Sequence, residues 1–157
     1  MLSVVSQLKS VHHVIITTAL LATAFTSGCA TPTGAAFSGA ETVAEGSAQI
    51  YLYRKSALAS SADGFDVKLN QQDMGELLNG SFMRLPVAPG THVLSVKPNV
   101  FSQTYERTLQ VADKQTIYVQ FGVPPILLMN AFMLGSDLSL RTSEEATADL
   151  KDLKAVK

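Results

Sequence analysis

The chain has 157 residues, and its 12 Lys and Arg side chains are balanced by 13 Asp and Glu side chains, so its formal net charge is −1. This balance argues against the basic stripe with which proteins bind nucleic-acid phosphates, so no nucleic-acid partner is expected. A hydrophobic fraction of 46% is ordinary for a globular chain, and the length favours one domain. The single cysteine excludes an intramolecular disulfide and a cysteine-based zinc cluster.

Residues 1–28 have the layout of a secretory signal peptide. They contain one fixed positive charge, Lys9, and no acidic residue, and an apolar or small run follows over residues 14–25. That run is too short for a bilayer-spanning helix, which needs roughly 20 residues. A positive region, a short apolar region and then small residues are typical of a signal peptide. We therefore expect cleavage between Gly28 and Cys29.

The only cysteine lies where this leader ends. Thr26, Ser27 and Gly28 precede Cys29, and small residues directly before a cysteine resemble a bacterial lipobox, where the thiol receives a diacylglyceryl group before cleavage. Thr26 departs from that pattern, because lipoboxes usually have an aliphatic residue there, so less efficient processing is expected. The alternative interpretation is an incidental thiol after an ordinary signal peptide. Lipidation of Cys29 also explains the position of the single cysteine.

A lipidated Cys29 predicts a membrane partner and a location. One acyl chain binds a membrane only marginally, whereas the several chains of a processed lipoprotein hold a domain there stably. The next residue is Ala30, and in the bacterial systems that this resembles, Asp at that position retains a lipoprotein in the inner membrane. An outer-membrane lipoprotein facing the periplasm is therefore expected. The lipidated cysteine and the small residues that follow, 29–46, predict a flexible tether.

From Ser47 onward the hydrophobic pattern has a period of two, which predicts β-strands. Asn79-Gly80 is a strong turn signal because both residue types tolerate positive φ, and Pro89-Gly90 predicts a second turn. Pro86 is expected at an edge or a strand end, because it lacks the N–H donor of a ladder. The expected strands cover residues 47–54, 65–69, 74–77, 82–87, 92–97, 104–111 and 116–123.

Short strands at this spacing predict a mainly β fold, an antiparallel β-sandwich of about seven strands between Ser47 and Leu140. The first strand is apolar or aromatic on both faces, so it is expected to be central and covered on both sides. The expected core comprises the apolar residues that alternate along the strands, namely Ile50, Leu52, Phe65, Val67, Leu69, Leu94, Val96, Leu109, Ile117, Val119 and Phe121.

The C-terminal residues predict a helix over 143–156, within a domain that extends over 47–157. Thr142 and Glu145 fit a capping box, in which each side chain bonds the backbone N–H of the other residue. Apolar residues follow at helical spacing and form a narrow stripe. This stripe favours a helix that covers one face of the sheet, and the alternative is an exposed helix that binds a partner.

Residues 123–135 are the most apolar stretch after the leader. Pro125 suits a first helical position and Gly135 the position after a helix, so residues 126–134 predict a short helix, too short to span a bilayer. Two interpretations stay open. The helix is either a plug that closes one end of the sandwich, or a Met-rich surface that docks on an envelope protein, a second copy or the membrane. The candidate interaction residues are Ile126, Leu127, Leu128, Met129, Phe132, Met133 and Leu134.

No catalytic residue, metal site or cofactor is expected. His92 is the only histidine after the leader; it has no second imidazole or thiolate nearby in the sequence and no Gly-x-Ser-x-Gly motif beside it. It is better interpreted as a histidine on the surface of a strand. Asp63, Asp66, Asp73 and Glu76 could act as paired carboxylates on a glycoside, but turn residues separate them, as on a solvated loop face.

Four segments carry a family resemblance in their order along the chain: residues 49–54, 67–70, 75–82 and 88–94. They resemble the small bacterial lipoproteins grouped as domain-of-unknown-function family twenty-eight forty-six. The order of strand, polar turn, Gly, strand and Pro-Gly-x-His is also similar to PEGA-type surface modules. The resemblance covers about residues 47–123 and implies a compact β-sandwich on a lipid tether, without an established activity and without catalytic residues.

The expected function is a lipid-anchored bacterial envelope protein whose sandwich is a non-catalytic binding or structural module. One alternative is a subunit of an envelope or secretion assembly with a transthyretin-like sandwich. A second alternative is a hydrolase that acts on an envelope glycan. A cleft lined by His92 and two carboxylates would favour the enzyme, whereas a flat apolar patch would favour a docking module.

Overall fold

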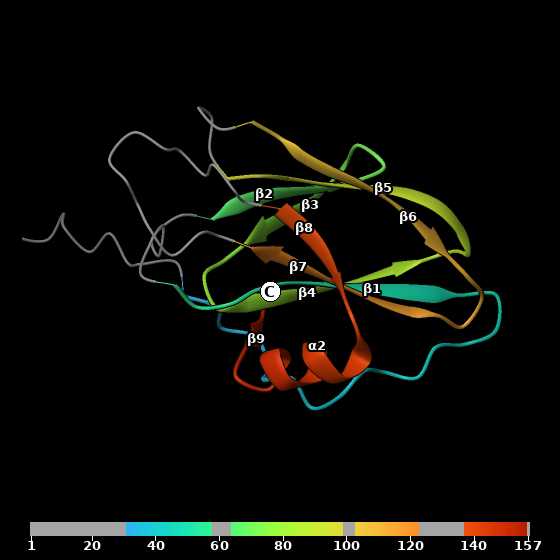
Figure 1. Cartoon of the computed structure of the whole chain (residues 1–157). Helices are drawn as coiled ribbons and strands as arrows, with labels where there is room; N and C mark the ends of the chain where they lie inside the picture. The colour runs from blue at the N-terminus through green and yellow to red at the C-terminus, as the bar shows by residue number, and fades with distance from the viewer. Residues whose placement is uncertain (1–30, 58–63, 99–102, 123–136, 157) are drawn as a thin grey trace, which may run out of the picture.

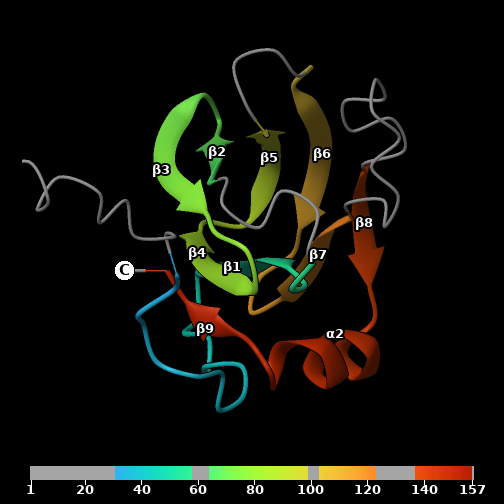
Figure 2. The same cartoon turned by 90° about the vertical axis from the view of Figure 1, so that its left-hand side faces the viewer.

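The computed structural model describes residues 31–57, 64–98, 103–122 and 137–156. These ranges form a five-stranded sheet in the order β8-β7-β1-β4-β9 and a four-stranded sheet in the order β3-β2-β5-β6. The two sheets pack face to face as a sandwich (Figures 1 and 2). The strands are β1 Ala48–Arg54, β2 Phe65–Leu69, β3 Gln72–Leu77, β4 Ser81–Val87, β5 Gly90–Lys97, β6 Tyr105–Val111, β7 Thr116–Gly122, β8 Asp137–Arg141 and β9 Lys154–Ala155.

Most strand pairs are antiparallel, but β1 pairs with β7, and β4 with β9, in parallel. The strands place the chain connections at two ends of the sandwich. We name one the Arg54 end, because β1 ends there, beside the first residue of β4, Ser81. Strand β7 also ends there, and its last residue Gly122 pairs with Asp137, the first residue of β8. The opposite end holds the tight turns at residues 70–71, 88–89 and 112–115.

The turn between β2 and β3 depends on two residues with positive φ. Asn70 has φ of 50° and Gln71 has φ of 67°, which suits the two-residue hairpin loops that follow the twist of the strands. Asn79-Gly80 differs from its prediction, since only Gly80 has positive φ, of 67°. The Asn79 side chain instead accepts from and donates to the backbone of Ala57, at 3.0 Å in each bond. This turn connects the two sheets and is not a hairpin.

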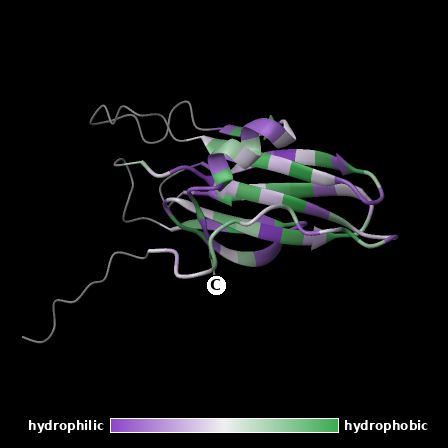
Figure 3. Cartoon of the chain, turned by 90° about the horizontal axis from the view of Figure 1, so that it is seen from below, coloured by the Kyte–Doolittle hydropathy of each residue, from purple (hydrophilic) through white to green (hydrophobic). Residues whose placement is uncertain are grey.

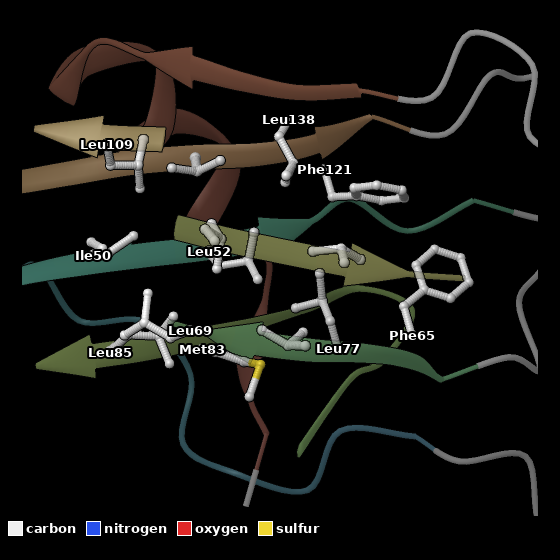
Figure 4. Packing of buried hydrophobic residues seen from close by; sticks show 14 of the residues in the cluster. Ile50, Leu52, Phe65, Leu69, Leu77, Met83, Leu85, Leu109, Phe121 and Leu138 are labelled. Atoms are coloured by element: carbon white, nitrogen blue, oxygen red, sulfur yellow. The ribbon is translucent and has the colours of Figure 1, made fainter. Parts of the chain in front are cut away.

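The predicted core is confirmed. Ten of its eleven residues are buried between the two sheets, and Ile117 packs against them in a partly buried position. The same layer also contains Ala48, Leu77, Met83, Leu85, Val111 and Leu138, and Figure 4 shows part of it. Hydrophobic and hydrophilic residues alternate along the strands (Figure 3), as the period of two predicts.

Strand β1 lies in the middle of its sheet and is buried along its whole length, as predicted. Ile50 and Leu52 point into the core between the sheets, whereas Tyr51 and Tyr53 belong to a second apolar cluster on the outer face. Pro86 lies on β4, opposite Gln49 of β1. In the described chain, β9 pairs only with the first two residues of β4. Beyond them β4 is an edge strand, and there the missing N–H of Pro86 is tolerated.

Helix α2, Ser143–Leu150, begins with the predicted capping box. The Thr142 hydroxyl accepts from the Glu145 N–H at 3.3 Å, and the Glu145 carboxylate accepts from the Thr142 N–H at 3.1 Å. The predicted extension of the helix to residue 156 is wrong. Backbone groups beyond the helix bond β4 instead, with the N–H of Val156 donating to the carbonyl of Phe82 at 3.0 Å.

The predicted role of the helix as a cover for the sheet is confirmed. Helix α2 lies on the side of the five-stranded sheet that faces away from the other sheet (Figure 2). Its apolar residues pack against aromatic side chains of that outer face. The cluster contains Tyr51, Tyr53, Phe82, Tyr118, Ala146, Leu150 and Leu153.

Candidate functional site

The two principal sites predicted from the sequence lie outside the described residues. These are the cleavage and lipidation site at Gly28 and Cys29, and the candidate interaction residues within 126–134. The residues that flank the second site are described. Gly122 and Asp137 pair across β7 and β8, so the chain leaves and re-enters the sandwich at the Arg54 end.

His92 is held by hydrogen bonds on the surface near the opposite end. Its Nδ1 lies 3.0 Å from the side-chain amide nitrogen of Asn70, which can only donate, so Nδ1 accepts. Nε2 then carries the proton and donates to the carbonyl of Ala88 at 2.8 Å. The amide oxygen of Asn70 also accepts from the N–H of Val93 at 2.9 Å. His92 therefore ties β5 to the β2–β3 turn, and no carboxylate is among these partners.

The predicted carboxylate cluster is spread over an exposed surface. Asp66, Asp73 and Glu76 are exposed, and Asp63 lies outside the described residues. Asp73 accepts from the N–H of Gly75 at 2.8 Å and so stabilises the register shift within β3. Within the described chain, no group of three or more His, Cys, Asp or Glu side chains is placed to hold a metal ion.

A polar hollow of about 470 Å³ lies on the outer face of the four-stranded sheet. Acidic and basic side chains line it, together with hydroxyl and amide groups. His92 is not among the lining residues. This composition suits contact with a polar surface. The lining residues are Asp66, Lys68, Gln71, Ser95, Lys97, Thr104 and Glu106.

Much of the segment predicted as a flexible tether, 29–46, is instead bonded to the sandwich. Residues 34–45, which we name the strap, cross the outer face of the five-stranded sheet. Gly34 donates to the carbonyl of Ala155 at 3.0 Å, Ala155 donates to Ala35 at 2.8 Å, and Phe37 donates to Leu153 at 3.3 Å. The strap thus continues the sheet beyond β9, because its backbone supplies the partners that the edge of β9 would otherwise lack.

Side chains fasten the strap as well. The Phe37 ring meets the rings of Tyr51 and Phe82 edge to face, with centroid distances of 5.7 and 5.6 Å. The Glu41 carboxylate lies 2.9 Å from the Arg84 guanidinium. Sequence reasoning missed these contacts, although Phe37 is the only aromatic residue in 30–46 and was the available signal.

A groove of about 440 Å³ opens where the strap crosses β4 near β3. Aromatic rings and two methionines line it, and the Glu41–Arg84 ion pair lies at it. Methionine side chains adapt their shape to different apolar groups. Its principal apolar lining residues are Phe37, Tyr51, Met74, Phe82, Met83 and Val156.

A polar clamp joins helix α2 to β1. The Tyr53 hydroxyl donates to one carboxylate oxygen of Asp149 at 3.1 Å, and the Lys55 ammonium lies 2.8 Å from the other oxygen. Burial raises the pKa of Tyr53 above its ordinary value, and the negative charge and hydrogen bond of Asp149 raise it further. The phenol therefore stays protonated and acts as a hydrogen-bond donor that positions the helix.

This pKa shift predicts how stability depends on pH. An unfolded tyrosine ionises near pH 10, whereas folded Tyr53 keeps its proton to higher pH. The folded state then binds more protons than the unfolded state, so its stability falls as the pH rises above about 10. Spectrophotometric titration of tyrosinate should show one phenol that ionises late in the folded protein, and Tyr53→Phe should abolish that late step. An unchanged titration curve in Tyr53→Phe would contradict the assignment.

Aromatic residues close the core at the Arg54 end. The Arg54 guanidinium, fully buried, stacks on the Phe65 ring at 3.8 Å from its centroid. The Phe121 ring meets the Phe65 and Tyr105 rings edge to face, at 5.4 and 5.5 Å. Described side chains from four strands therefore cover the core at this end.

The sequence model of a family described as "Protein of unknown function (DUF2846)" matches residues 44–124. The chain belongs to this family. The match spans β1 to β7, which make up most of both sheets, and the described sandwich agrees with the fold that the resemblance implied. Strand β8, helix α2, β9 and most of the strap lie outside the matched range.

No curated protein matches the chain. Within the described residues, no helix is long and apolar enough to cross a membrane.

Proposed function

We propose that the protein is a lipid-anchored component of the bacterial envelope, held at the outer membrane with its domain in the periplasm. The observation that carries the proposal is the only cysteine, Cys29, directly after a leader with the layout of a signal peptide. Only residues 30–33 separate this cysteine from the strap, so a lipid on it would hold the whole domain close to a membrane.

We propose further that the sandwich is a non-catalytic binding or structural module. Two arrangements support this. Both ring nitrogens of His92 are engaged, with Asn70 and with Ala88, so neither is directed at a substrate. The exposed carboxylates Asp66 and Glu106 share their hollow with Lys68 and Lys97, so the acidic and basic charges there offset one another.

Replacing Cys29 by Ser tests the anchor. Without the thiol, no diacylglyceryl group can be attached, so we expect the protein to move from the membrane fraction to the soluble periplasmic fraction. A radiolabelled fatty acid supplied to the cells should label the wild-type chain and leave Cys29→Ser unlabelled. Ser38→Ala, an exposed change in the strap, is the control that should stay labelled and membrane-bound. An unlabelled wild-type chain would overturn the proposal.

The partner site that we propose for this module is residues 126–134, in the role of an exposed docking surface. The closure of the core at the Arg54 end supports this, because the rings of Phe65, Phe121 and Tyr105 already meet there. The paired residues Gly122 and Asp137, which flank residues 123–136, lie at that end. An envelope protein or a second copy is the partner that we propose for this segment.

A further inference from the structure

The strap fixes where the N-terminal part of the chain reaches the sandwich. Gly34 and Ala35 bond to Ala155, and Ala155 pairs with Phe82, the second residue of β4. Strand β4 begins at the Arg54 end, so the strap is joined to the sandwich near that end. Figure 1 agrees, since the described chain begins on the side where β1 ends and β2 begins.

The chain between the anchor and the strap is short. An extended residue spans at most about 3.3–3.6 Å, so the path from Cys29 to Gly34 covers less than roughly 20 Å. The headgroup layer takes up about 5–7 Å of that path. A free tether over 29–46 would instead reach about 60 Å and leave the domain without a preferred orientation.

Resting on the proposed lipid anchor, we propose that the strap orients the sandwich on the membrane, with the Arg54 end, and with it the flanks Gly122 and Asp137 of the proposed docking segment, facing the bilayer. The exposed residues that the structure describes at this end are polar, which suits a hydrated headgroup layer. The cations Lys55 and Lys154 are offset there by the exposed Asp137 and by Asp149, which lies 2.8 Å from the Lys55 ammonium, so the end suits zwitterionic headgroups. The opposite end, with its turns at 70–71 and 112–115, then points away from the membrane. The exposed polar residues described at the Arg54 end include Lys55, Ser56, Gln103, Thr104, Asp137 and Lys154.

The two ends are far enough apart to be distinguished by a depth measurement. Strand β7 extends over seven residues, and at about 3.3 Å per residue it separates the ends by roughly 23 Å. The chain has no tryptophan, so one introduced tryptophan is a unique fluorescent reporter. Gln103→Trp places it at the Arg54 end and Ala112→Trp at the opposite end, both at exposed positions.

The experiment uses the full-length gene product purified from bacterial membranes and reconstituted into phosphatidylcholine vesicles with a nitroxide on a fraction of the headgroups. We expect Gln103→Trp to lose most of its emission to the quencher, whereas Ala112→Trp keeps most of its emission. Equal quenching at the two positions, or stronger quenching at Ala112→Trp, would overturn the proposed orientation.

A strap variant tests the cause of the orientation. At Gly34 an added Cβ would lie 2.8 Å from both the carbonyl carbon and the Cβ of Ala155, so Gly34→Ala pushes the strap away from β9. In that background the difference between the two reporters should shrink, whereas the exposed control Ser38→Ala should preserve it. A full difference in Gly34→Ala, with a lowered melting temperature that reports the displaced strap, would show that the strap does not set the orientation.

Failure of the anchor and failure of the orientation give different results. A chain without a lipid does not float with the vesicles, whichever position carries the tryptophan. Its Cys29 thiol is then free and, as the only thiol in the chain, can be coupled to a maleimide lipid. The same quenching comparison on the coupled chain tests the orientation even where natural lipidation has failed.

Discussion

Replacing Leu52 by Ala is expected to destabilise the domain by about 2–5 kcal/mol. Leu52 is completely buried on the central strand β1, with β4 on one side and β7 on the other. Its side chain lies in the layer between the two sheets (Figure 4). Truncation removes buried methyl groups and leaves a cavity that the two sheets can fill only in part.

A matched control separates burial from the loss of a leucine. Leu140 on β8 is 50% exposed, so Leu140→Ala makes the same chemical change where little apolar area is lost. Urea denaturation of both variants should give a large loss of unfolding free energy for Leu52→Ala and a loss within about 0.5 kcal/mol for Leu140→Ala. Equal losses in the two variants would show that β1 does not lie at the centre of the core.

The double variant Leu128→Ser, Phe132→Ser should remain folded and lose association with its partner. Both residues lie in the apolar segment outside the described residues. The two interpretations of that segment predict opposite effects of the double variant on the behaviour of the folded protein. A docking surface gains solubility when two large apolar groups become hydroxyls, because exposed apolar area decreases. A plug instead places two unpaired hydroxyls in the core, which costs several kcal/mol.

Thermal melting and sedimentation distinguish these outcomes. We expect a cooperative transition near the wild-type temperature and a decrease in self-association or in capture of envelope protein. Val93→Ser, at a side chain that is 37% exposed on the second sheet, is the control that should change neither property. Loss of the cooperative transition in the double variant would assign residues 126–134 to the core.

The sequence predicts the two-sheet core well because its period of two is a direct consequence of strand geometry. Phe65, Val67 and Leu69 are buried while the residues between them are exposed, as the alternation indicated. Strand β1 was recognisable as central because both of its faces are apolar or aromatic. The capping box at Thr142 was also recognisable, because it depends on residues three positions apart.

The outer layer could not be predicted in the same way. Strand β9 has two residues, and the strap is rich in small residues, so neither has a periodicity that a sequence can reveal. Both are held by backbone hydrogen bonds, which any residue except proline can donate. The predicted helix to residue 156 failed for the same reason, since the N–H groups of Lys154 and Val156 donate to the carbonyls of Gly80 and Phe82.

The polar clamp between Tyr53 and Asp149 also depends on tertiary structure. The two residues are separated by 96 positions in the chain, and each belongs to a different element. His92 is a contrast, because its interpretation as a surface histidine followed from its place in a strand, and its bonds to Asn70 and Ala88 agree with it.

The intact mass of the protein purified from bacterial membranes tests the proposed lipid anchor most directly. We expect a chain that begins at Cys29 and carries a diacylglyceryl group on its sulfur, with the mass of residues 1–28 missing. Treatment of the same sample with a lipase should remove acyl chains and shift the mass accordingly. A chain that retains residues 1–28, or one that begins at an unmodified Cys29, would contradict the lipid anchor.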